Sequence, residues 1–229
     1  MNRFNRNITA ALSLLMGSFF TLNVQASTGT NPTDEAISAQ QKSWAVANYQ
    51  LKDDAQQKAF EKLILDADNA TQSFPDSAKI WAWSGIIKSS YAAVEGGLGA
   101  LSLVKAAKKD FEKALALDEN ALEGSTYASL ALLYHKVPGW PIAFGSDDKA
   151  EEFFKKALKI NPLGRESNFF YGEFLYDERK YKQAKNHLLA AKNVPFWADR
   201  PVAYKHRQQQ ITAMLAKVEK RLAKRKNRR

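Results

Sequence analysis

Apolar residues recur at helical spacing along the chain from about residue 34 onward. Residues 34–51 illustrate the pattern, because Ile37, Trp44 and Tyr49 fall among the apolar positions of one amphipathic segment. A period near 3.6 residues predicts α-helix rather than strand. The pattern therefore predicts an all-α protein, in which helix pairs at about residues 34–75, 77–119, 121–162 and 165–195 precede a long final helix within residues 199–229.

Three of the predicted pairs share a motif of small and large apolar residues in the second helix. The motif reads Ala107-x3-Phe111-x2-Ala114, Ala150-x3-Phe154-x2-Ala157 and Ala184-x3-Leu188-x2-Ala191. The first helices carry aromatic residues near a small residue, as in Trp81-x3-Gly85, Tyr127-x3-Ala131 and Tyr171-Gly172. Small residues let two helices approach closely and large residues fill the space between them. Because a lone helix pair cannot bury its apolar face, such units are expected to stack on one another.

These motifs, between residues 79 and 195, resemble those of the tetratricopeptide-repeat family. The resemblance implies a right-handed α-solenoid of about four helix pairs over residues 34–198, followed by a C-terminal capping helix and a basic tail at 199–229. It also implies that the first helix of each pair lines a concave groove. The inward-facing positions would be Lys79, Ala82, Ile86, Ser89 and Ser90 in one pair, Ser125, Ala128, Leu132, His135 and Lys136 in the next, and Glu166, Phe169, Glu173, Tyr176 and Asp177 in the fourth.

Residues 1–26 have the pattern of a secretory signal peptide. Arg3 and Arg6 precede an apolar run at 8–22, and Val24-Gln-Ala26 is a small-residue cleavage site. Such segments are removed on export, so cleavage is expected after Ala26 and the product is expected to be periplasmic or secreted. An uncleaved membrane anchor is the alternative. Residues 27–33, rich in Ser, Thr and Gly, are predicted to form a flexible linker.

Charge is concentrated at the C-terminal end of the chain. The net charge of the whole chain is +10, but residues 27–198 hold 21 basic and 22 acidic residues, whereas residues 199–229 hold 11 basic and 2 acidic residues. In an exported protein, this tail favours an anionic envelope surface as partner over nucleic acid. A solvated, solubilising end is the alternative interpretation. The chain has no cysteine, which excludes disulfides, thiolate metal ligands and cysteine nucleophiles.

An unusual loop separates the two helices of the third pair. It contains Pro138, Gly139, Trp140, Pro141 and Phe144. The two prolines restrict the backbone and the glycine permits positive φ. One interpretation is a rigid loop that presents its aromatic residues to a partner. The other, which we favour, is that both aromatic side chains fold back between helices as a plug.

The remaining candidate residues give no catalytic constellation. His135 and Lys136 are expected on the groove surface, where they could hold an anionic group, but no nucleophile motif, zinc motif or phosphate loop accompanies them. Ser146, Asp147 and Asp148 fit a helix N-cap with an acidic first turn better than a calcium site, which needs six or more oxygen ligands. We therefore predict no catalytic site, no metal and no cofactor.

The sequence thus leads to two functional hypotheses. The first is an exported, non-enzymatic scaffold that binds a protein or peptide in its concave groove. The predicted contacts are Ser125, Leu132, His135, Lys136, Phe169, Glu173, Tyr176 and Asp177, with the loop at one end. The second is a transporter-accessory or solute-binding protein with a pocket between lengthened helices, since the architecture is similar to that of the T component of TRAP-type solute transporters. An open groove would favour the first hypothesis, and a closed apolar cavity the second.

Overall fold

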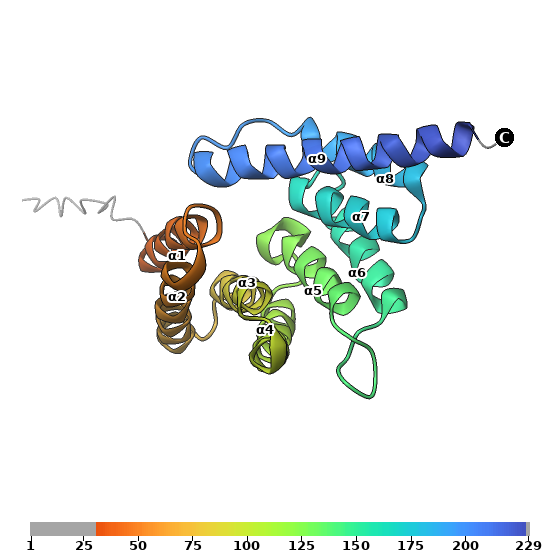
Figure 1. Cartoon of the computed structure of the whole chain (residues 1–229). Helices are drawn as coiled ribbons and strands as arrows, with labels where there is room; N and C mark the ends of the chain where they lie inside the picture. The colour runs from red at the N-terminus through yellow and green to blue at the C-terminus, as the bar shows by residue number, and fades with distance from the viewer. Residues whose placement is uncertain (1–30, 228–229) are drawn as a thin grey trace, which may run out of the picture. The chain divides into compact units, whose positions relative to one another are not determined.

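The computed structural model describes residues 31–227, so the predicted signal peptide lies outside the described residues. Within 31–227 the chain is all α-helical, with no strand, as the hydrophobic pattern predicts (Figure 1). The helices are α1 (Pro32–Tyr49), α2 (Asp53–Ser73), α3 (Ala78–Glu95), α4 (Gly97–Leu117), α5 (Ser125–Lys136), α6 (Asp147–Ile160), α7 (Arg165–Asp177), α8 (Tyr181–Lys192) and α9 (Pro201–Lys226), with a 3-10 turn, η1 (Ala121–Gly124), before α5. No helix in this part of the chain combines the length and apolarity that a membrane span requires.

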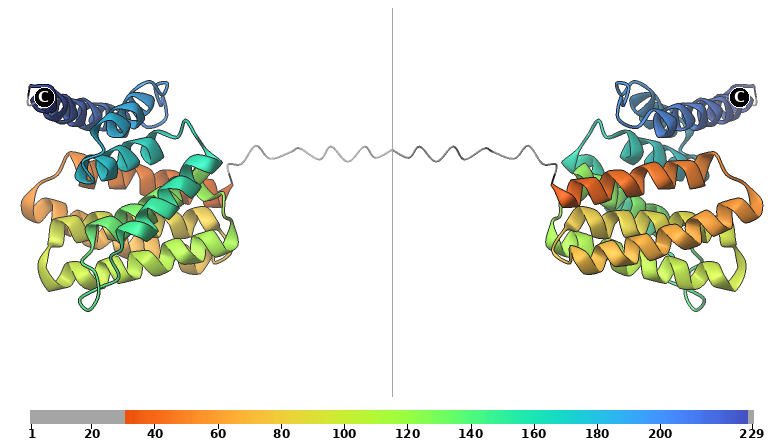
Figure 2. Two further views of the ribbon diagram at one scale, coloured as in Figure 1. Left: turned by 90° about the vertical axis from the view of Figure 1, so that its right-hand side faces the viewer. Right: turned by 90° about the vertical axis from the view of Figure 1, so that its left-hand side faces the viewer.

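Helices that follow one another in the chain pack side by side: α1 with α2, α3 with α4, α5 with α6, and α7 with α8 (Figures 1 and 2). The shared motif lies at these contacts. All nine of its residues in the second helices are fully buried, namely Ala107, Phe111, Ala114, Ala150, Phe154, Ala157, Ala184, Leu188 and Ala191. In these three pairs the small residues therefore let the two helices approach closely, and each large side chain fills the space between them.

Gly85 and Gly172 lie at close helix crossings. A Cβ at Gly85 would lie 2.7 Å from the ring of Phe111, and a Cβ at Gly172 would lie 2.8 Å from Cγ of Leu188. Contacts below 3.0 Å are essentially never made by real Cβ atoms. The same arrangement thus recurs in α3–α4 and α7–α8, with the glycine of the first helix facing the large motif residue of the second.

The extra residues of the second pair lengthen both of its helices. α3 ends at Glu95, α4 begins at Gly97, and only Gly96 lies between them. Gly96 and Gly97 have φ values of +67° and +57°, a conformation that side chains with a Cβ rarely adopt. These glycines therefore permit an abrupt reversal, and the remaining residues extend the helices.

The final helix, α9, packs against helices from both ends of the described chain. α9 lies against α7 and α8, and its N-terminal half also contacts α1 (Figure 1). Buried Ile211, Leu215 and Val218 belong to the apolar core of α4 to α8, whereas Ala203 belongs to the core of α1 to α3. Helices from the two ends of the described chain therefore meet, and α9 belongs to both cores.

The contact at Gly172 predicts a specific loss of stability. Gly172→Leu should lower the free energy of unfolding by about 1–3 kcal/mol, because the new side chain must displace Leu188 from a filled core. Gly139→Leu is the matched control, since a Cβ at Gly139 would meet only Gly145 O at 3.4 Å, an ordinary contact. Urea denaturation of both variants measures the difference. Equal stability of the two variants would contradict the close crossing.

Candidate ligand-binding cavity

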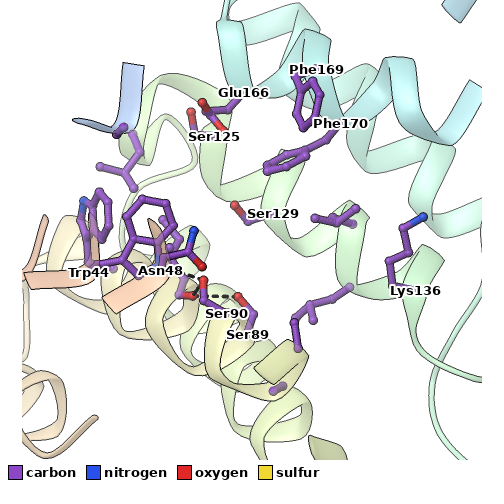
Figure 3. Close-up of a pocket in the computed structure, with 18 of the residues that line it drawn as sticks. Trp44, Asn48, Ser89, Ser90, Ser125, Ser129, Lys136, Glu166, Phe169 and Phe170 are labelled. Carbon is purple, nitrogen blue, oxygen red and sulfur yellow. Dashed lines mark hydrogen bonds between the residues drawn. The ribbon is translucent and has the colours of Figure 1, made fainter. Parts of the chain in front are cut away.

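A cavity of about 1380 Å³ lies between α1, α3, α5, α7 and α9. The first helices of the four pairs thus surround one space, to which α9 and the N-terminal part of α4 also contribute (Figure 3). The contact between α1 and α9 joins the two sides of the wall. We call this space the central cavity.

Aromatic side chains form two walls of the central cavity. Trp44 and Trp83 lie on one side, with their ring centroids 5.8 Å apart in an edge-on arrangement. Phe169 and Phe170 lie on α7 (Figure 3). Trp44 Nε1 donates a hydrogen bond to Ser90 Oγ at 2.9 Å, which fixes the indole against α3. Rigid aromatic surfaces of this kind supply much of the binding energy at protein interfaces.

Small polar groups occupy the positions between the aromatic walls. They are Asn48 from α1, Ser89 and Ser90 from α3, and Ser125 and Ser129 from α5 (Figure 3). Hydroxyl and amide groups can both donate and accept hydrogen bonds. The hydroxyls of Ser89 and Ser90 already donate to Ile86 O, at 3.0 and 2.7 Å, so Asn48, Ser125 and Ser129 are the groups of this set that can donate to a ligand.

A buried ion pair fixes the wall between α7 and α9. Arg207 is 7% exposed, and its Nε donates to Glu166 Oε1 at 3.1 Å while its Nη2 donates to Glu166 Oε2. The guanidinium carbon also lies 4.4 Å from the centre of the Phe169 ring and 4.9 Å from that of Phe170. This paired and stacked arrangement satisfies the desolvated charge and holds the two phenylalanine rings in place.

Glu173 is the cavity carboxyl whose ionisation the surroundings disfavour. It is half-buried, and burial raises its pKa above the ordinary value, although Arg207 and Lys136 act in the opposite direction. Lys217 from α9 also lowers the pKa and Asp177 raises it. Glu173 therefore sits where an N–H donor from a ligand would stabilise its charged form.

A stack of alternating cationic and aromatic side chains closes the cavity beside α9. Arg200 lies between Trp83 and Trp197, at 5.1 and 5.3 Å from their ring centres, and Arg165 lies between Trp197 and Tyr204, at 4.5 and 4.2 Å. The stack connects α3, α7 and the start of α9. Each cation–aromatic contact contributes about 0.5–2 kcal/mol, with the larger value for desolvated groups.

The predicted groove residues divide into two sets. Five of them line the central cavity: Ser125, Leu132, Lys136, Phe169 and Glu173. The other three, His135, Tyr176 and Asp177, lie outside the cavity wall at the ends of α5 and α7. Tyr176 instead accepts a hydrogen bond at its hydroxyl from Arg221 Nε at 3.3 Å, which connects α7 to α9.

His135 and Lys136 are engaged with carboxylates of their own chain. Nδ1 of His135 lies 2.7 Å from Asp147, and its Nε2 lies 3.0 Å from Asp177, which also accepts from Lys136 Nζ at 2.8 Å. Burial raises the pKa of Asp177, but the hydrogen bonds from His135 and Lys136 outweigh that effect and lower it. These two residues therefore already hold carboxylates of their own chain, Asp147 at the start of α6 and Asp177 at the end of α7.

The loop between α5 and α6 separates its two aromatic residues. Phe144 packs edge-on against Tyr134, with ring centroids 5.2 Å apart, and so fills the gap between the helices as expected. Trp140 is 89% exposed, so the prediction that it is buried as a plug is wrong. The turn that spans Gly139 to Ala143 directs the chain outward before Phe144 returns to the helices. Pro138 and Ile142 line the mouth of the central cavity.

The helix cap after this loop forms as predicted. Ser146 Oγ accepts a hydrogen bond from Lys149 N, and Asp147 and Asp148 occupy the first turn of α6. Within residues 31–227, no group of three or more His, Asp or Glu side chains is arranged to hold a metal ion. The two aspartates are thus explained by the helix terminus and by the contact between Asp147 and His135.

Sequence reasoning missed the cavity residues of the first and last helices. Trp44 and Asn48 come from α1, and Arg207, Gln210 and Met214 come from α9. The first pair lacks a clear motif, and the last helix was treated only as a cap. One signal was present in α9, where residues at alternating spacings of four and three reach the cavity, but nothing in the sequence shows that this face turns inward rather than toward solvent.

Comparisons with protein-family models and with curated proteins found no match for this chain.

Trp140 is exposed and Trp44 is buried, so their removal should affect stability to different extents. Trp140→Ala should change the free energy of unfolding by no more than about 0.5 kcal/mol, as at other exposed sites. Trp44→Ala should lower it by about 3–5 kcal/mol, because it empties a buried aromatic site and leaves Ser90 without its donor. Denaturant titrations of both variants provide the measurement. A large loss from Trp140→Ala would show that the loop packs differently in solution.

The raised pKa of Glu173 predicts a pH-dependent stability difference. A carboxyl that binds its proton more tightly in the folded state loses stability as pH rises from its ordinary value of 4.5 through its folded pKa. Glu173→Gln removes this loss, so the variant should melt at a higher temperature than the wild type at pH 7. Below pH 4.5 the two proteins should converge. Melting curves over this pH range test the sign, and a less stable variant at pH 7 would contradict it.

Proposed function

We propose that this chain is an exported, non-enzymatic helical-repeat scaffold of the tetratricopeptide type that binds a peptide segment of a partner protein in the central cavity. The observation that supports the proposal is that residues from separate helix pairs meet around one space. Inward-facing positions assigned from the repeat pattern in three separate helix pairs line one space, including Ser89, Ser125 and Phe169. Export rests on residues 1–26 alone.

The size and chemistry of the cavity favour a peptide over a compact solute. Small-molecule pockets usually measure about 300–1,000 Å³, whereas the central cavity measures about 1380 Å³. A peptide carries backbone N–H and C=O groups that need hydrogen-bond partners, and hydroxyls such as those of Ser125 and Ser129 can provide them. The aromatic walls can hold its apolar side chains.

A variant that fills the cavity tests this proposal. The probe is a pool of fluorescently labelled random peptides, and fluorescence anisotropy measures its binding to the mature chain. Ser129→Trp on α5 and Ser89→Trp on α3 (Figure 3) should each weaken binding about tenfold or more, because the indole occupies the space that the peptide needs.

Ser102→Trp is the matched control, because Ser102 is exposed on α4 and does not line the cavity. It should bind the pool as the wild type does, and melting temperatures should show that all three variants fold. Equal binding by the cavity variants and the control would contradict a cavity site.

The second candidate is a transporter-accessory or solute-binding protein. The observation in its favour is the contact of α9 with α1, which closes the wall around the cavity. Native mass spectrometry of the protein purified from an envelope fraction distinguishes the two candidates. A retained small molecule that Ser129→Trp abolishes, without peptide binding, would favour this second function.

A further inference from the structure

The face of α9 that lines the central cavity continues beyond the cavity as a basic stripe. Ala203, Arg207, Gln210, Met214 and Lys217 line the cavity at alternating spacings of four and three residues. The same spacing leads next to Arg221 and Lys224, so these two residues share that face of the helix. Lys220 lies beside them, three residues from Lys217 and four from Lys224.

The stripe carries cations that the chain leaves largely uncompensated. Within residues 31–227, no carboxylate lies within 4.0 Å of the ammonium groups of Lys217, Lys220 or Lys224. The acidic residue of this part of α9, Glu219, pairs with Lys185 of α8 at 3.1 Å. Glu173 is the nearby cavity carboxyl that acts on Lys217, and Arg221 donates to Tyr176. The stripe is therefore positive where it leaves the cavity.

We propose that the peptide bound in the central cavity carries an acidic segment next to the part that enters it, and that this segment lies along Lys217, Lys220, Arg221 and Lys224. This inference rests on the proposed peptide-binding function and specifies the partner for it. Lys217 to Lys224 spans roughly 10 Å of helix, which an extended peptide covers with about three residues. Opposite charge along this path would fix the direction in which the peptide lies and speed its encounter with the cavity.

An acidic peptide fits this stripe better than an anionic membrane does. Lys217 belongs to the cavity wall itself, so the stripe is continuous with the binding site. A lipid surface is best met by cations on an outward face, and insertion is helped by exposed apolar residues among them. On the exposed positions of α9 from Lys217 onward, the only non-charged side chain is Ala223, which is not a membrane anchor.

Two matched peptide pools test the inference with the mature chain. Both contain the same random segment, and one carries about four glutamates at either end while the other carries glutamines. The glutamate pool should bind about tenfold more tightly at low salt, which is the combined effect expected of a few exposed ion pairs. This advantage should decrease as sodium chloride screens the charges.

Charge-neutral variants locate the effect. The triple variant Lys217→Gln, Lys220→Gln, Lys224→Gln should bind both pools equally. The control Lys58→Gln, Lys109→Gln, Lys113→Gln removes the same charge from exposed positions of α2 and α4 away from the cavity, and it should keep the full advantage of the glutamate pool.

The outcomes separate this inference from the function on which it rests. Equal binding of both pools by the wild type would overturn the acidic segment and leave the peptide site intact. If the triple lysine variant still binds the glutamate pool more tightly, the acidic segment does not lie along the stripe. Binding of neither pool would contradict the proposed function, and the inference would fall with it. Binding to phosphatidylglycerol vesicles that the stripe variant loses, without any advantage for the glutamate pool, would assign the stripe to a membrane.

Discussion

The central cavity depends on the contacts that the start of α9 makes with α1 and α3. Arg165 and Arg200 alternate with Trp83, Trp197 and Tyr204 in one stack, and Arg165 Nη2 also donates to the carbonyls of Val194 and Pro195 at 2.6 and 2.9 Å. Arg165 is almost fully buried, and this burial lowers its pKa. The aromatic faces and carbonyl oxygens offset part of the desolvation of its charge. Together with the stacked rings of Tyr49 and His206, whose centroids lie 4.7 Å apart, this stack joins the start of α9 to α1 and α3.

Because of these contacts, α9 belongs to two apolar cores at once. α9 contributes Ile211 and Val218 to the core of the later helices and Ala203 to the core of the earlier ones, while its inward face supplies Arg207 and Lys217 to the cavity. In open repeat arrays each unit contacts only its neighbours, so stability adds up along the array. Here the last helix couples the first pair to the fourth. A change in the N-terminal half of α9 is therefore expected to affect the cavity and both cores together.

The parts of the fold that follow from local spacing could be read from the sequence. The burial of Phe111, Phe154 and Leu188 and the close crossing at Gly172 depend on residues a few turns apart, and five of the eight predicted groove residues line the cavity. The rest depends on long-range contacts. No local pattern shows that α9 returns to α1, and therefore none shows that Trp44 shares a cavity with residues of α9. Trp140 was misjudged because its neighbour Phe144 alone fills the available space between the helices.

The distribution of charge around the cavity suggests how selectivity would arise. The buried pair of Glu166 and Arg207 is mutually satisfied, so it shapes the wall and offers little to a ligand. Glu173 is different, because burial disfavours its charge. A ligand that covers Glu173 without donating to it would leave a carboxylate further desolvated, whereas a backbone N–H would stabilise it. Aromatic walls would thus supply affinity for many apolar segments, and Glu173 with the flanking lysines would discriminate among them by hydrogen bonding and charge.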